Sequence, residues 1–235
     1  MRIRRLMLGS ALALGLLAGE AGAENQVFGV TLSGLPAGEI VLSGRQEGGR
    51  YEAGSSIRAI GLLGALARLR YEGTTVGRIA GDGSLEPERH LAEARSLRSE
   101  RRTEILFDNG DPVQVTMVPP RSRQLDPAEQ DGTIDPVSAV FQLLLAPPAG
   151  AVCNRRVELF DGARRSRVEL GQAELRDGAL VCNGRYVRLS GEEHAIEQSD
   201  YGFRLFFHGD GAGGVTLWRI EAPTRYGLAV ATRRG

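Results

Sequence analysis

The chain has 235 residues, 42% of them hydrophobic, and its 29 basic residues balance 29 acidic ones. This balance argues against the strong positive charge that is typical of nucleic-acid-binding proteins. Every basic residue is arginine, which excludes chemistry that needs a lysine, such as a Schiff base or a phosphate-loop lysine.

The first 23 residues have the three-part pattern of a cleavable signal peptide. Arg2, Arg4 and Arg5 give a positive start, the run from Leu6 to Leu17 is apolar, and Ala21-Gly22-Ala23 is a small-residue cleavage site. The apolar run is too short to span a bilayer, which takes about 20 residues. The alternative, a buried N-terminal helix, stays open.

The segment after the cleavage site, 24–235, is predicted to be a single, soluble, β-rich domain in the periplasm. A lipid anchor would need a cysteine after Leu17-Ala18-Gly19, and Glu20 stands there instead. No later segment is long and apolar enough to be a transmembrane helix. We therefore expect no transmembrane segment after signal cleavage and no nucleic-acid partner.

Alternation of apolar and polar residues, broken by glycine turns, predicts antiparallel strands along most of this domain. Strands are expected at 28–33, 39–43, 51–59, 70–79, 103–107, 113–118, 155–160, 167–170, 185–189, 203–208, 215–221 and 226–232. About a dozen strands rarely remain one flat sheet. The predicted fold class is mainly β, an antiparallel, strongly curled sheet (half-barrel, barrel or β-spiral) around one buried helix.

The three strands between residues 155 and 189 illustrate the pattern. Val157 and Leu159 alternate with charged residues, and Asp161-Gly162 marks a tight turn before the next strand. We expect the third strand to place Val187 and Leu189 on the same buried face, in a meander with one buried and one solvated side.

One helix is predicted to begin at Asp135, a suitable N-cap, with Pro136 at the first helical position. Its apolar residues recur at helical spacing and form one stripe: Val137, Val140, Phe141, Leu144 and Leu145. A helix with this pattern is expected to fill the concave side of the sheet.

A shorter apolar segment, 62–69, carries little polar cover. It caps one end of the barrel or forms an exposed binding lip, and both interpretations stay open. Under the second, Leu62, Leu66 and Leu69 would bind an apolar ligand, such as a lipid, or an envelope protein.

The chain contains two cysteines, Cys153 and Cys182, both in the exported part. In an oxidising compartment an even pair of cysteines most often forms a disulfide. A metal site is the weaker alternative, because neither cysteine has a second Cys or a His close by in the sequence.

An ordered set of motifs runs through the chain: Ala37-Gly38-Glu39, R-Y-E-G-T-T-V-G-R-I, G-D-G-S-L-E-P-E-R-H, I-L-F-D, D-P-V-S-A-V-F-Q-L, Cys153, F-D-G-A-R-R and Cys182. Together they resemble the bacterial domain-of-unknown-function 3108 family of exported envelope proteins. The resemblance implies no activity and no catalytic residues. It carries over only the two cysteines, as a disulfide.

Acid–base or metal chemistry has one candidate in the sequence, Glu192-Glu193-His194 with Glu197 and Asp200 nearby. Such a run between two strands is usually a solvated loop. We assign no catalytic, metal or cofactor residue. The sequence favours a non-catalytic periplasmic protein that binds an apolar ligand or a protein partner. The alternative is a hydrolase acting on an envelope polymer or lipid.

Overall fold

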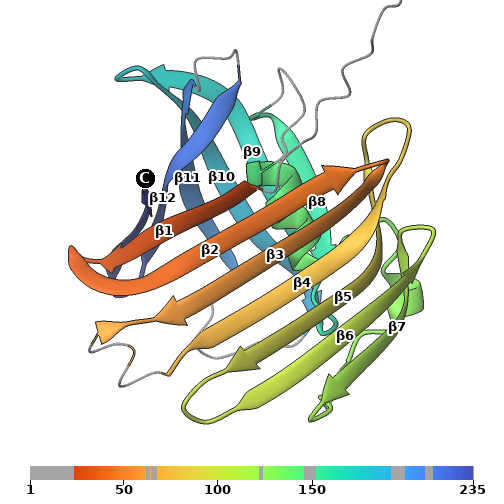
Figure 1. Cartoon of the computed structure of the whole chain (residues 1–235). Helices are drawn as coiled ribbons and strands as arrows, with labels where there is room; N and C mark the ends of the chain where they lie inside the picture. The colour runs from red at the N-terminus through yellow and green to blue at the C-terminus, as the bar shows by residue number, and fades with distance from the viewer. Residues whose placement is uncertain are drawn as a thin grey trace, which may run out of the picture.

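The computed structural model describes residues 24–61, 64, 68–121, 124–145, 152–191, 199–209 and 214–234. They form one antiparallel sheet of thirteen strands in the order β7-β6-β5-β4-β3-β2-β1-β13-β12-β11-β10-β9-β8. The sheet curls so that its two halves face each other, with the helical segment between them (Figure 1). The predicted fold class is confirmed. The sheet is curled but not closed, because β7 and β8 are its edges.

Strands in each half follow one another in sequence order. The first half contains β1 (Glu24–Leu32), β2 (Leu35–Glu47), β3 (Arg50–Ala59), β4 (Arg70–Ile79), β5 (Leu85–Arg95), β6 (Glu100–Asp108) and β7 (Asp111–Val118). The second half contains β8 (Arg155–Phe160), β9 (Arg164–Arg176), β10 (Ala179–Gly191), β11 (Asp200–Gly209), β12 (Val215–Thr224) and β13 (Gly227–Arg234). The halves join in the middle of the sheet, where β1 pairs with β13.

The helical segment begins where the sequence predicts. The Asp135 side chain accepts hydrogen bonds from the backbone N–H groups of Val137 and Ser138, and Pro136 opens the helix α2 (Pro136–Val140). The chain then continues as a π-helix, η2 (Phe141–Leu145). Phe141 is buried and stacks on Tyr51 of β3, with ring centroids 5.4 Å apart. The helix is therefore held inside the curl.

The connection between β7 and α2 bridges the gap between the two edge strands. It includes a short 3₁₀ turn, η1 (Pro127–Glu129). The N–H of Gly132 donates to the Asp111 side chain at the start of β7 (2.9 Å). The N–H of Ile134 donates to the Glu158 carbonyl of β8 (3.1 Å), and the N–H of Phe160 donates to the Ile134 carbonyl (2.9 Å).

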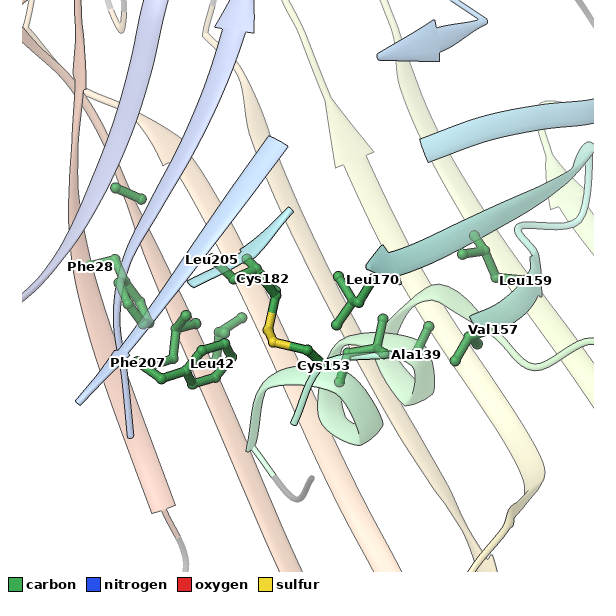
Figure 2. Packing of buried hydrophobic residues seen from close by; sticks show 13 residues of the cluster. Phe28, Leu42, Ala139, Cys153, Val157, Leu159, Leu170, Cys182, Leu205 and Phe207 are labelled. Atoms are coloured by element: carbon green, nitrogen blue, oxygen red, sulfur yellow. A yellow bond between two sulfur atoms is a disulfide. The ribbon is translucent and has the colours of Figure 1, made fainter. Parts of the chain in front are cut away.

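The main hydrophobic core lies between the helical segment and the strands around the β1–β13 seam. It includes Phe28, Leu42, Leu143, Phe207 and Leu217. Figure 2 shows the Cys153–Cys182 disulfide within this core, beside the helix. The disulfide predicted from the sequence is confirmed.

One detail of the predicted meander is wrong. Val187 pairs with Arg167, whereas the neighbouring Tyr186 pairs with Val168 and bonds through its hydroxyl to buried Ser166. Leu189 is exposed. Irregularities in the β9–β10 register, at 182–184 and 188–190, shift the side-chain alternation of the third strand.

Within the described ranges we find no helix with both the length and the apolar character needed to cross a membrane. The expected signal peptide, residues 1–23, lies outside the residues that the structure describes.

Candidate functional site

A cavity of about 350 Å³ lies inside the curl, between β3–β6, the start of α2 and the β8–β9 turn. Much of its wall is apolar and comes from four elements: Ile57 of β3, Ala92 of β5, Met117 of β7, and Val137 and Val140 of α2. Seven polar or charged side chains also line it: Ser55, Tyr71, His90, Arg101, Thr103, Arg121 and Asp161.

Strand register brings the polar residues to one side of the sheet. Thr75 of β4 pairs with His90 of β5, and His90 pairs in turn with Ile105 of β6. Because side chains alternate along a strand, Thr75 and His90 point to the interior together. His90 is 2% exposed and Thr75 is 1% exposed, and of the two only His90 lines the cavity.

His90 faces the carboxylate that begins the helix. Its Nδ1 lies 3.0 Å from Oδ1 of Asp135 and 2.9 Å from Oγ1 of Thr75. The Thr75 hydroxyl donates to the same Asp135 oxygen (2.7 Å). Asp135 is fully buried. Two neighbouring strands and the helix start thus converge on one carboxylate.

Asp135 is also bound from the helix side. The Ser138 hydroxyl donates to Oδ2 of Asp135, and the hydroxyl groups of Tyr51 and Ser138 lie 2.7 Å apart. Since the proton of Ser138 goes to Asp135, Tyr51 donates to Ser138. The result is a buried polar network of Tyr51, Thr75, His90, Asp135 and Ser138, which fixes the helix start against three strands.

The electrostatics of the network keep its carboxylate charged. Burial by itself would raise the pKa of Asp135, but the adjacent His90 and the hydrogen bonds from His90, Ser138 and Thr75 together hold that pKa below its usual value. The pKa of Tyr51 is raised, first by burial and then by the nearby Asp135 charge. Tyr51 therefore remains a hydrogen-bond donor.

His90 and Tyr71 both line the cavity. Nδ1 makes the contacts of His90 with Thr75 and Asp135. The Tyr71 hydroxyl makes no protein hydrogen bond within the described ranges. Its ring lies over Gly73, where a Cβ would stand 2.6 Å from the hydroxyl oxygen. Burial is the first cause that raises the pKa of Tyr71, followed by Asp135 and Asp161.

The site residues predicted from the sequence are placed only in part. Leu62 and Leu66 lie outside the described residues. Leu69 is 48% exposed and its carbonyl accepts from the N–H of Ala59, at the ends of β3 and β4 that also carry Ile57 and Tyr71. It stands near the outer end of the cavity but does not line it.

Of the acid–base candidate Glu192-Glu193-His194 with Glu197 and Asp200, the structure describes only Asp200. Glu192, Glu193, His194 and Glu197 lie outside the described residues. Asp200 pairs with Arg185 on the neighbouring strand β10.

Sequence reasoning missed His90, Thr75 and Asp135 as a group. Asp135 was expected only as a helix cap. One signal could have indicated the cavity: small residues recur with period two at Ala92 and Ala94 of β5. A period-two run of small residues on an interior face leaves space where bulky side chains would fill it.

Comparison with known proteins supplies a family and a similar fold. The model of the family described as "Protein of unknown function (DUF3108)" matches residues 27–174. A search of the curated proteins found no match. A crystal structure of a β-barrel-like protein of domain of unknown function DUF1849 from Brucella abortus aligns with 14% sequence identity and a TM-score of 0.46. The alignment covers 89% of this chain and 95% of that one.

Proposed function

We propose that this chain, which belongs to the DUF3108 family of proteins of unknown function, is an exported, non-catalytic binding protein of the periplasm. It takes an apolar or amphipathic ligand, such as a lipid, into the cavity inside its curled sheet. The observation that carries this proposal is the cavity itself.

The cavity has the features of a small-molecule site. Its volume of about 350 Å³ lies within the usual range of ligand pockets, about 300–1,000 Å³. Apolar side chains such as Met117, Val137 and Val140 make up much of the wall, and His90 and Tyr71 add directed polar groups. Mostly apolar walls with few polar contacts suit ligands that are themselves mostly apolar.

Export is supported by the sequence of residues 1–23 and by the disulfide. A bonded Cys153–Cys182 pair is typical of proteins in oxidising compartments. We expect osmotic shock to release a protein that begins at Glu24, which intact-mass measurement checks. A mass that retains residues 1–23, or one increased by a lipid, would contradict export as a soluble protein.

The His90–Asp135 pair is the one observation that favours the alternative, a hydrolase. Histidine paired with aspartate serves as a general base when its other nitrogen contacts a nucleophile. Here the hydroxyl within hydrogen-bond distance, that of Thr75, lies at Nδ1 on the Asp135 side. Among the described residues no hydroxyl or thiol reaches Nε2. This arrangement supports binding over nucleophilic catalysis.

The test is to fill the cavity. Ala92→Phe places a ring in the cavity, whereas Leu91→Phe on the same strand changes a residue that is 39% exposed. Native mass spectrometry of freshly purified protein should show a co-purifying ligand with the wild type and with Leu91→Phe, and none with Ala92→Phe. A thermal melt of each variant checks folding.

Two results would overturn the proposal. One is a wild-type protein that carries no ligand and binds none of a panel of lipids and fatty acids. The other is a ligand that Ala92→Phe retains in full.

A further inference from the structure

We propose that the cavity binds an amphipathic anion with a single apolar chain, whose head group lies beside Arg101 and Arg121 at the mouth and whose chain lies inside. This inference deepens the proposed function and rests on it. The strand register, the exposure of the cavity wall and the charges that line it support the proposal.

The wall of the cavity becomes more exposed from one end to the other. At the inner end His90 of β5 pairs with Ile105 of β6, and the two residues are 2% and 0% exposed. Farther along β5, Ala94 is exposed and pairs with Tyr71 of β4 and with Arg101 of β6. The mouth is therefore at the level of Ala94, roughly 13 Å from His90 at the usual rise of a strand.

Two arginines line the cavity at this level. Nη1 of Arg101 donates to the carbonyl of Pro119, directly after β7 (3.1 Å). Arg121 follows in the same segment, and both arginines belong to the cavity wall. A guanidinium group has five N–H donors and keeps its charge in proteins, so a contact such as that with Pro119 leaves donors for a ligand. Hydrogen bonds from arginine to a carboxylate or phosphate are among the strongest that a protein makes.

The other titratable groups of the wall also favour an anion. Among the lining residues that the structure describes, the two arginines face one carboxylate, that of Asp161 in the β8–β9 turn. Asp161 also accepts from two backbone N–H groups of that turn. Burial, followed by Asp135 and Asp161, raises the pKa of Tyr71, so its hydroxyl stays protonated and can donate to an anion. The wall thus has more positive than negative charge.

Behind the mouth the wall suits a carbon chain. The apolar side chains on the way to His90 are Ala92, Met117, Val137 and Val140. The hydroxyl side chains Ser55 and Thr103 carry no charge. A long, narrow space with these walls accommodates one linear chain, and burial of that chain supplies the apolar part of the binding free energy.

The depth of the wall sets the orientation of the ligand. A charged head group at the inner end would lose its water, which costs free energy unless an opposite charge is available there. Any positive charge on His90 is already balanced by Asp135, whose Oδ1 lies 3.0 Å from Nδ1. At the mouth the head group stays in contact with water and meets the arginines. The chain therefore points inward.

The experiment compares three ligands with the same carbon chain, which are decanoate, decyl phosphate and 1-decanol, by isothermal titration calorimetry of the full chain. At about pH 7.5 carboxylic acids and phosphate esters are both ionised. The tighter of the two anions should bind about 10- to 100-fold more tightly than 1-decanol, the usual gain from hydrogen bonds between charged groups. The anion with the larger gain identifies the head group as a carboxylate or a phosphate.

A matched pair of variants on β6 tests the arginine at the mouth. Arg101→Gln keeps a hydrogen-bond donor without the charge, so that anion should bind roughly 10-fold more weakly and 1-decanol as before. Arg102→Gln changes the next residue, which points to the outer face, is 69% exposed and lies near Glu93 and Glu100. It should bind all three ligands as the wild type does.

A third variant should shift the affinity in the opposite direction. Asp161→Asn keeps the oxygen that accepts from the turn and takes away the negative charge opposite the arginines. The same anion should bind roughly 2- to 5-fold more tightly, the range for one partly exposed charge interaction, and 1-decanol should bind unchanged. Damage to the cavity would weaken binding in this variant, so tighter binding separates an effect of charge from an effect on structure.

The outcomes separate this inference from the proposed function. If 1-decanol binds as tightly as both anions, the inference is overturned and the binding function stands. A gain for the anion that persists in both Arg101→Gln and Arg121→Gln also overturns it. If Arg101→Gln loses 1-decanol as well, Arg121→Gln and Asp161→Asn decide in its place. If none of the three ligands binds the wild type, the inference fails, and the lipid panel with Ala92→Phe decides the function separately.

Discussion

At the scale of single residues, Asp135 joins the helix to the sheet. Its carboxylate accepts from two backbone N–H groups of α2, from Ser138 and Thr75, and lies beside His90. A buried charge is tolerated only when its hydrogen bonds are made. The network therefore contributes most to stability while Asp135 is ionised.

The pKa of Asp135 predicts an acid-sensitive fold. Its pKa is lowered in the folded protein, so its stabilisation is fully present above the ordinary aspartate pKa of about 3.9 and is lost as the pH falls through the lowered value. Urea unfolding across this range should show a steep loss of stability in the wild type and a shallower one in Asp135→Asn. Asp126→Asn, at the exposed N-cap of η1, is the matched control and should keep the steep wild-type dependence.

The disulfide predicts a second effect at this scale. It joins two buried cysteines that are 29 residues apart. Replacing both with alanine should lower the free energy of unfolding by roughly 2–5 kcal/mol, the usual cost of losing a native bridge. Reductant should lower the stability of the wild type by a similar amount and leave the double variant unchanged. A stability loss under 1 kcal/mol, by either route, would contradict this.

At the scale of elements, the helical segment fits the sheet because glycine makes room for it. A Cβ at Gly44 of β2 would lie 2.4 Å from Cε2 of Phe141, closer than any real contact allows. Phe141 in turn stacks on Tyr51. One small and one large side chain thus set how closely the helical segment approaches β2 and β3.

Both residues are open to test by chemical denaturation. Phe141→Ala should cost roughly 3–5 kcal/mol, the range for a truncated buried aromatic, whereas Leu175→Ala at a 79% exposed site should change stability by less than about 0.5 kcal/mol. Gly44→Ala should cost roughly 1–3 kcal/mol by overpacking. In the Phe141→Ala background Gly44→Ala should become nearly neutral. A cost of the same size in both backgrounds would show that Phe141 does not cause it.

The elements show which parts of the fold could be predicted from the sequence. The strand β8 was predictable because the bulky apolar residues Val157 and Leu159 alternate with charged ones. The helix start was predictable because Asp135-Pro136 is a local cap signal. The strand β5 was missed. Its interior positions hold His90, Ala92 and Ala94, and Pro87 interrupts it, so no bulky alternation marks it.

The candidate site could not be predicted for the same reason. His90 lies on the missed strand, Thr75 on its neighbour and Asp135 on the helix, and only strand pairing and helix docking bring them together. The segment 62–69 was predicted to be a binding site from its leucine content alone. Nothing in the sequence indicated which other part of the fold it would contact. Of its three proposed site residues, the structure describes Leu69 alone, outside the cavity wall.

At the scale of the whole molecule, side-chain packing holds the open edges of the sheet together. Phe160 at the end of β8 is fully buried against Ile105 and Phe107 of β6. Gly162 in the following turn lies against Met117 and Val115 of β7. The cavity is bounded on this side by that contact between distant strands.

Loss of the contact should loosen one end of the sheet first. Phe160→Ala should increase amide hydrogen exchange in β6 and β7, while β1 and β13 in the middle of the sheet keep the wild-type exchange. Mass-spectrometric hydrogen exchange on the peptides of each strand checks this. Equal acceleration in all strands would indicate that the sheet opens as one unit.

The pairing of β1 with β13 has a consequence for the order of folding. All other strand pairs join neighbours in the chain, so each half is a meander of short-range contacts. The seam is different, because Val27 pairs with Arg234 across almost the whole sequence. Contacts between distant residues form slowly, since the loop that they close loses conformational entropy first. The two meanders are thus expected to form early and independently, with the seam between the halves as the rate-limiting step. In a chain that emerges from its N-terminus, the first meander would then be complete before α2 and the β8–β9 turn, which supply the other walls of the cavity, are in place.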